Sequence, residues 1–182
     1  MLGGSFNPAH AGHLHVARAA LRALRLDEVW LLVSPGNPLK PRAGMAPFAQ
    51  RLESARRIAR GPRIRASDAE ARTGTRYTVD TLRRLRQRFP RRRFILVIGA
   101  DNLAQLPRWR RWRSIIRMVP LAVLPRPGYT RPALRGAAAS VMRRGRRRPA
   151  ALMRAGRGWA LVPAAERAIS ATAIRSGALQ VA

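Results

Sequence analysis

The chain has 182 residues, 47% of them hydrophobic, with 37 lysines and arginines against 8 acidic residues and a net charge of +29. This size and apolar content suffice for one domain, so we expect a single domain, 1–182. No apolar run approaches the roughly 20 residues of a membrane span, and the start does not resemble a signal peptide, so we expect the protein in the cytoplasm. The absence of cysteine excludes disulfides, zinc–thiolate sites and thiol catalysis, and the positive charge predicts polyanionic partners.

Strand-like and helix-like stretches alternate along the chain. Short apolar runs predict strands, and longer stretches with apolar residues at three- and four-residue steps predict amphipathic helices. The expected strands are 28–35, 63–71 as a weaker candidate, 94–101, 121–128 and 159–164, and the expected helices are 13–24, 47–60 and 78–89. This alternation predicts an α/β fold: a Rossmann-like, doubly wound parallel sheet with helices on both faces.

The start of the chain departs from this rhythm. A glycine-rich turn at Gly3 and Gly4 leads into a helix, but only two residues precede it. The strand expected before such a turn is normally central in a doubly wound sheet. We therefore expect the first strand to be largely missing, with the natural N-terminus several residues upstream or the copy truncated, and the C-terminus to stop soon after the last helix begins.

A basic segment at 131–158 is rich in arginine, glycine and alanine. We expect a solvated, partly flexible insertion in the domain, with a dedicated polyanion site as the alternative.

The three histidines of the chain all follow the glycine-rich turn. The glycines allow a sharp turn and close approach of a ligand, but the spacing fits neither common nucleotide-binding loop. His10 and His13, three positions apart at a helix start, lie on one face beside the positive end of the helix dipole and can donate hydrogen bonds to a phosphoryl oxygen. Taken alone, they could also be ordinary helix-start residues, and His15 is expected to pack or lie at the surface.

A second phosphate-binding pattern occurs near the other end of the chain. Ser170 and Thr172 can cap a helix whose free N–H groups face a phosphate, and Arg175, one turn later, adds guanidinium donors to the same anion. Read alone, this is only a well-capped helix.

Several motifs together resemble one enzyme family. GGSFNPAHAGHL (3–14) closely resembles the signature of the HxGH nucleotidyltransferase superfamily, and ISATAIR (169–175) is similar to its second signature, with alanine in the third place. The segments GNPLKP (36–41), RYTVDTL (76–82) and IGADNLAQLPRW (98–109), followed by RPGY, resemble those of bacterial nicotinate-nucleotide adenylyltransferases. The resemblance covers nearly the whole chain and thins in the basic segment.

The resemblance implies an enzyme of NAD biosynthesis. Members of that family transfer the adenylyl group of ATP to nicotinic acid mononucleotide, forming deamido-NAD and pyrophosphate with the help of Mg²⁺. With only eight acidic residues in the chain, we expect Mg²⁺ to arrive on ATP, with no metal site made by the protein.

The resemblance also assigns residues to the two substrates. His10, His13, Lys40 and Arg175 are implied as the catalytic group that grips the phosphates, with amides from the second signature. The implied ATP-binding residues are Gly3, Gly4, Ser5, Phe6, His10, His13, Gly99, Asp101, Ile169, Ser170, Thr172 and Arg175. The implied mononucleotide-binding residues are Asn37, Lys40, Tyr77, Thr78, Asp101, Trp109 and Arg110.

Three of these residues have particular expected roles. Asp101 follows an apolar strand, where open α/β sheets place ligands, and is expected to accept a ribose hydroxyl, although it could instead cap the next helix. Trp109 resembles the family tryptophan that stacks on the pyridine ring, although its spacing alone is typical of a core aromatic. Arg110 stands where some members have an aromatic, and we hypothesise that it or a neighbour reads the nicotinate carboxylate.

Two other functions compete with this one. A sibling adenylyltransferase would use nicotinamide mononucleotide or phosphopantetheine as acceptor. A basic RNA-binding protein would explain the charge, but no motif with interleaved aromatics is visible, and arginine excess can also follow from genomic base composition. We expect no specific nucleic-acid or membrane partner, and the sequence leaves the oligomeric state open.

Overall fold

The computed structural model describes residues 1–36 and 44–166. Its strands are β1 (Leu2–Gly4), β2 (Val29–Val33), β3 (Ile64–Ser67), β4 (Leu96–Gly99), β5 (Leu121–Leu124) and β6 (Trp159–Leu161). Its α-helices are α1 (Ala11–Leu24), α2 (Phe48–Ile58), α3 (Ala69–Arg72), α4 (Thr78–Arg88), α5 (Ala100–Gln105), α6 (Trp112–Met118), α7 (Thr130–Arg135), α8 (Ala137–Met142) and α9 (Pro149–Ala155). Two 3₁₀ turns are η1 (Leu106–Arg108) and η2 (Arg143–Gly145).

The strands form one parallel sheet in the order β3-β2-β1-β4-β5-β6. The order reverses direction at β1, which is the switch point where doubly wound sheets bind ligands. All five strands predicted from the apolar runs are present, each shorter than its prediction. The three predicted helices are also present, as α1, α2 and α4, within a few residues of the expected limits.

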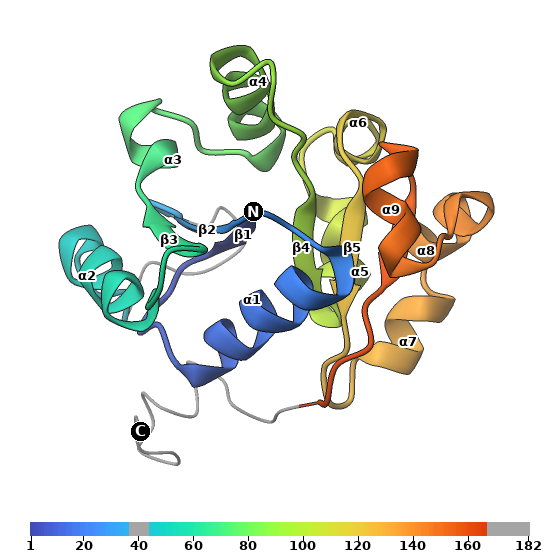
Figure 1. The fold of residues 1–182 in the computed structure, drawn as a ribbon, viewed down its shortest axis with the longest axis horizontal. Coiled ribbons are helices and arrows are strands. Elements are labelled where there is room, and N and C mark those ends of the chain that lie inside the picture. Colours follow the sequence, from blue (N-terminus) through green and yellow to red (C-terminus); the bar gives the residue numbers. More distant parts are fainter. Residues whose placement is uncertain (37–43, 167–182) are drawn as a thin grey trace.

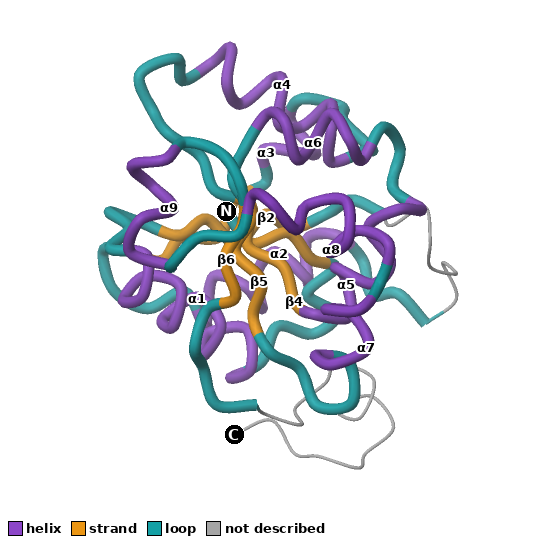
Figure 2. Tube along the Cα trace, turned by 90° about the vertical axis from the view of Figure 1, so that its right-hand side faces the viewer, coloured by secondary structure: helices purple, strands orange, loops and turns teal. Residues whose placement is uncertain are grey.

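Alternating strand residues separate two hydrophobic layers. Val29, Leu31 and Val33 of β2 face one layer, whereas Leu32 faces the other. The first layer is covered by α1, α2 and α9, and the second by helices from α3 through α8 (Figures 1 and 2). Because both faces are covered, the central strands are apolar on every residue, which explains their continuous apolar runs.

The first strand, expected to be largely missing, is present in short form. β1 has three residues and lies between β2 and β4, with Leu2 opposite Leu31 on one side and Val97 on the other. The glycine-rich turn therefore leaves the middle of the sheet at its carboxyl edge.

The segment 131–158, expected as a solvated and partly flexible insertion, consists of short helices that pack on the domain. Ala133, Ala138, Ala139 and Met142 join the second hydrophobic layer, and Leu152 joins the first. The sequence pattern concealed this because the buried residues are mostly alanines spaced among arginines.

Candidate nucleotide-binding site

The two HxGH histidines form the N-terminal cap of α1. His10 is the N-cap residue, and its Nδ1 accepts a hydrogen bond from the Gly12 N–H at 3.2 Å, while His13 Nδ1 accepts from the His10 N–H at 3.2 Å. Since both Nδ1 atoms accept, we assign the proton of each neutral ring to Nε2. The ring centroids lie 3.9 Å apart. The helix cap thus fixes two neighbouring imidazoles as Nε2–H donors.

The environment of His10 keeps its ring uncharged. The side chain is buried, and this desolvation, with a smaller effect of the positive charge on Arg126, lowers the pKa of His10 from 6.5 to about 4. A neutral imidazole at pH 7 can still donate one hydrogen bond through Nε2. His10 is therefore suited to binding a phosphate oxygen and unsuited to carrying a full positive charge.

The glycine-rich turn supports His13 through Phe6. Phe6 is buried in a left-handed conformation with φ 48°, and its ring lies 4.7 Å from that of His13. A Cβ at Gly4 would stand 3.2 Å from this ring, so a glycine leaves the aromatic side chain its space.

A buried arginine from α2 holds the loops around this turn together. The Arg51 guanidinium donates to the carbonyls of Ser5 (2.7 Å), Ser34 (2.6 Å) and Pro35 (3.1 Å), and its Nε donates to Ala46 (2.9 Å). Burial lowers the pKa of Arg51 below its usual value. We call this the Arg51 clamp, and it joins the ends of β1 and β2 to the start of α2.

A second buried network lies beside the clamp. Glu70 of α3 accepts a hydrogen bond from Thr81 of α4 at 3.2 Å, and Thr81 also lies 3.0 Å from the Thr75 hydroxyl. Burial raises the pKa of Glu70, while hydrogen bonds from Thr81 and Ser34 act in the opposite direction. Since Ser34 also belongs to the Arg51 clamp, the network connects the glycine-rich turn to α4, which begins at Thr78.

Asp101 lies just after the carboxyl end of β4 and has a side-chain oxygen, Oδ1, that can accept a hydrogen bond. Its Oδ1 is buried and has no hydrogen-bond partner within residues 1–36 and 44–166, and its Oδ2 lies 3.8 Å from Nε of Arg126. A Cβ at Gly99 would come within 2.4 Å of Oδ1. The expected capping alternative is not seen, since Gly99 is the N-cap of α5 and no side-chain cap bond is made. A buried, unsatisfied carboxylate oxygen is the feature that a ligand hydroxyl would complete.

Residues implied for the mononucleotide lie at the starts of α4 and α6. The Arg110 guanidinium stacks over the Tyr77 ring, 4.8 Å from its centroid, and Tyr77 directly precedes Thr78 at the start of α4. Trp109 is half-buried against the second hydrophobic layer. The Glu70 network connects α4 to Ser34, the residue that directly follows β2 at the carboxyl edge of the sheet.

The structure brings the remaining predicted residues together only in part. Gly3 and Gly4 end β1, Ser5 and Phe6 follow in the turn, Gly99 ends β4, and Asp101 lies in the first turn of α5. Asn37, Lys40, Ile169, Ser170, Thr172 and Arg175 lie outside the described residues. Within the described chain, the last residues do return to this region, since His15 Nε2 lies 3.1 Å from the Ala165 carbonyl and Thr130 donates to Glu166 at 2.6 Å.

Sequence reasoning missed Arg51, Glu70 and Arg126. Arg51 was hidden among the arginines of an amphipathic helix, although it occupies the same face as buried Leu52 and Ala55. Glu70 gave no signal. Arg126 begins the RPGY motif, but the sequence did not indicate that its side chain lies near Asp101 and His10.

No three histidine, cysteine or acidic side chains gather as metal ligands in the described part of the chain. Nor does that part contain a helix of the length and apolarity needed to cross a membrane.

Fold and site together define a nucleotidyltransferase of the α/β class. A family model described as cytidylyltransferase-like matches residues 1–177. A relative from Gluconobacter oxydans is 62% identical over 96% of this chain and 92% of its own, and one from Gluconacetobacter diazotrophicus is 56% identical over 99% and 86%; both are named "Probable nicotinate-nucleotide adenylyltransferase". The chain belongs to this cytidylyltransferase-like family, in the group of its nicotinate-nucleotide adenylyltransferase relatives.

Solved structures agree on the fold. The nicotinic acid mononucleotide adenylyltransferase of Plasmodium falciparum, complexed with NaAD, matches with a TM-score of 0.64 at 18% identity, over 74% of this chain and 68% of the other. This structural match confirms the Rossmann-like prediction. The family model and the relatives confirm the family that the motifs indicated.

Proposed function

We propose that this protein transfers the adenylyl group of ATP to nicotinic acid mononucleotide, releasing pyrophosphate and forming deamido-NAD, as a cytoplasmic step of NAD biosynthesis. The observation that carries the proposal is the pair of capping imidazoles at the switch point, whose two Nε2–H groups are fixed by the backbone of α1. The relatives' name supports the choice of acceptor.

The chemistry needs positioning and charge neutralisation more than proton transfer. The 5′-phosphate of the mononucleotide is already an anion and attacks the α-phosphorus of ATP, forming the new P–O bond as the bond to pyrophosphate breaks. His10 and His13 donate from Nε2 to phosphate oxygens as charge develops, and no general base is required. Asp101 accepts a ribose hydroxyl on its unsatisfied Oδ1.

Other assigned roles rest on the resemblance alone. We assign Lys40 and Arg175 to the triphosphate, and the amides and hydroxyls of 169–172 to the same anion. We also assign Mg²⁺ to ATP itself, where it would supply positive charge to the phosphates, because the chain has only eight acidic residues.

Arg110 is our candidate for reading the acid group of the substrate. Its guanidinium stacks on the ring of Tyr77. The family resemblance implies that the nicotinate carboxylate meets the backbone near Tyr77 and Thr78, so this stacking supports the assignment. Arg110→Ala should reduce the preference for nicotinic acid mononucleotide over nicotinamide mononucleotide by about tenfold in kcat/KM. Arg108→Ala is the matched control, since Arg108 is an exposed arginine two residues earlier. An unchanged preference in Arg110→Ala would exclude this role.

The main test is pyrophosphate release with ATP and a panel of acceptors. Nicotinic acid mononucleotide should react fastest, ahead of nicotinamide mononucleotide and phosphopantetheine. His10→Ala or His13→Ala should each lower kcat by roughly 10²- to 10³-fold. His15→Ala is the control and should leave the rate unchanged, because the side chain of His15 makes its one hydrogen bond among the described residues to the Ala165 carbonyl. Phosphopantetheine as the best acceptor, or full activity without His13, would refute the proposal.

A further inference from the structure

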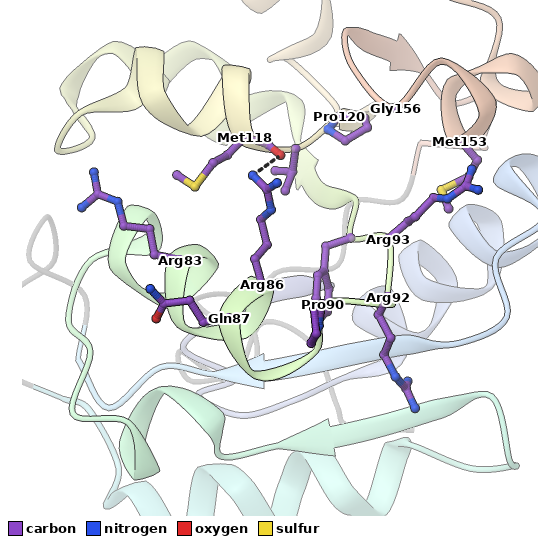
Figure 3. A pocket seen from close by; sticks show the side chains of 12 residues that line it. Arg83, Arg86, Gln87, Pro90, Arg92, Arg93, Met118, Pro120, Met153 and Gly156 are labelled. Carbon is purple, nitrogen blue, oxygen red and sulfur yellow. Dashed lines mark hydrogen bonds between the residues drawn. The ribbon is translucent and has the colours of Figure 1, made fainter.

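A pocket of about 580 Å³ opens at the edge of the sheet opposite the histidines (Figure 3). It is bounded by the last turns of α4, the 90–94 loop, the 118–120 junction before β5 and the end of α9. These segments precede β4, β5 and β6, so the pocket lies at the amino edge of the parallel strands. We call it the amino-edge pocket, and it shares no residue with the nucleotide site.

Four arginines line this pocket, and two of them pair with acidic residues, one of which, Glu28, also pairs with Arg65. Arg83 pairs with Asp80 at 3.1 Å, and Arg92 pairs with Glu28 and points away from the pocket in Figure 3. No acidic residue is among the lining residues.

The other two guanidiniums form no ion pair among the described residues. Arg86 rises from α4 and donates to the Met118 carbonyl at 3.3 Å, a neutral partner that orients the side chain (Figure 3). Arg93 extends toward Met153 and makes no hydrogen bond or ion pair within residues 1–36 and 44–166. The pocket therefore presents two uncompensated positive charges.

The rest of the lining is apolar. Phe94, Met118, Val119, Pro120 and Met153 contribute to it, and methionine side chains adapt to ligands of different outline. The volume falls in the range of small-molecule sites, which are mostly apolar with a few placed polar groups. A ligand suited to this lining carries an apolar body and an anionic end.

We propose that the amino-edge pocket binds a phosphate monoester of a small apolar group. A phosphate monoester carries up to two negative charges at neutral pH, which matches Arg86 and Arg93, and three oxygens that accept guanidinium hydrogen bonds. The apolar group would lie against the two methionines. The inference does not depend on the reaction at the opposite edge of the sheet.

Methionine methyl NMR tests this directly, with phenyl phosphate as the probe. In protein labelled at the methionine methyl carbons, titration should shift the signals of Met118 and Met153 in a saturable way and leave buried Met142, in α8, unchanged. Inorganic phosphate and phenol should each shift these signals less, because inorganic phosphate lacks the apolar ring and phenol lacks the phosphate group. The signals are assigned by replacing each methionine with leucine.

Charge variants then separate a built site from general attraction. Arg93→Gln should weaken phenyl phosphate binding about tenfold without affecting folding, since Arg93 has no partner to lose. Arg86→Gln should have a similar effect, and Arg91→Gln is the matched control, being an exposed arginine two residues away that does not line the pocket. The proposal fails if neither methyl signal moves, if Arg91→Gln weakens binding equally, or if inorganic phosphate or phenol alone reproduces the shifts.

Discussion

His10 is the ionisable residue on which the nucleotide site depends. Its pKa is lowered from 6.5 to about 4 by desolvation and, secondarily, by Arg126. Between those values the unfolded chain binds a proton that the folded protein does not, so the contribution of His10 to stability is complete above pH 6.5 and is lost as the pH falls toward 4.

We expect the His10 ring to titrate near pH 4, as measured by NMR of imidazole-labelled protein. Arg126→Gln should raise that midpoint, because it removes the smaller of the two causes. Arg131→Gln, a neighbouring exposed arginine, should leave it in place. A midpoint near 6.5 would show that the ring is hydrated and charged at mildly acidic pH.

The Arg51 clamp determines how α2 is attached to the sheet. Replacing Arg51 leaves four carbonyls without their donor, so Arg51→Gln should cost about 2 to 4 kcal/mol of unfolding free energy and lower kcat/KM, because the glycine-rich turn loses its support. Arg51→Lys should recover only part of both, since an ammonium group cannot reach four diverging carbonyls. Denaturant unfolding and initial rates measure the two effects.

Arg57 provides the comparison for the clamp. It lies on the same helix, is exposed and faces solvent, so Arg57→Gln should change neither quantity. If Arg51→Gln were as stable as the parent, the four hydrogen bonds would contribute nothing to the attachment of α2.

The Glu70 network makes the stability of the junction of α3 and α4 depend on pH above the ordinary glutamate range. Burial raises the pKa of Glu70, so above the ordinary glutamate range the folded protein retains a proton that the unfolded chain loses, and stability falls as the pH rises. Glu70→Gln keeps an oxygen for Thr81 but cannot ionise. Its melting temperature should therefore exceed that of the parent at pH 8, by about 3 °C for each kcal/mol, and match it at pH 4. Glu53→Gln, exposed on α2, should show no such divergence.

The helices and strands could be predicted from the sequence where their apolar and polar residues follow a regular pattern. Both-face burial made β4 and β5 continuous apolar runs, and one-face burial gave α1 and α4 their helical period. Arg51 and Glu70 could not be predicted, because a buried polar residue has the same letter as an exposed one and its partners are backbone carbonyls or distant hydroxyls. The short helices of 131–158 were missed for a related reason: their buried residues are alanines, which are common on either side of a helix.

The two histidines lie at a helix start, as their spacing predicted, and His10 has the additional role of capping the helix. Their spacing placed them on one face at a helix start, whereas the structure makes His10 the cap that precedes the helix. A string of letters does not reveal which ring nitrogen accepts from the backbone. The position of Asp101 at a strand end was predicted because the edge of a parallel sheet is fixed by topology.

Across the whole molecule, lysines and arginines far outnumber the acidic residues that can pair with them. All eight acidic residues lie in the described part, and six ion pairs are formed there, against 37 lysines and arginines in the chain. Such a surface attracts any polyanion without requiring a built site.

We therefore expect RNA to bind weakly and without sequence preference. Affinity for two unrelated RNAs of equal length should fall steeply and in parallel as salt increases, because the attraction comes from released counterions. Fluorescence anisotropy at several salt concentrations measures this. A marked preference for one RNA that persisted at high salt would revive the RNA-binding alternative.

Because the side chain of His10 caps the start of α1, substitutions at position 10 should affect the stability of the helix as well as phosphate binding. Asparagine offers a side-chain oxygen at about the place of Nδ1 and is a favoured residue before a helix, yet it has nothing that extends as far as Nε2. Alanine lacks both. If variants at position 10 are compared in cells, the abundance of the protein should follow the quality of the helix start, so the asparagine variant should be abundant and the alanine variant depleted. Growth that depends on the enzyme should be lost with either variant.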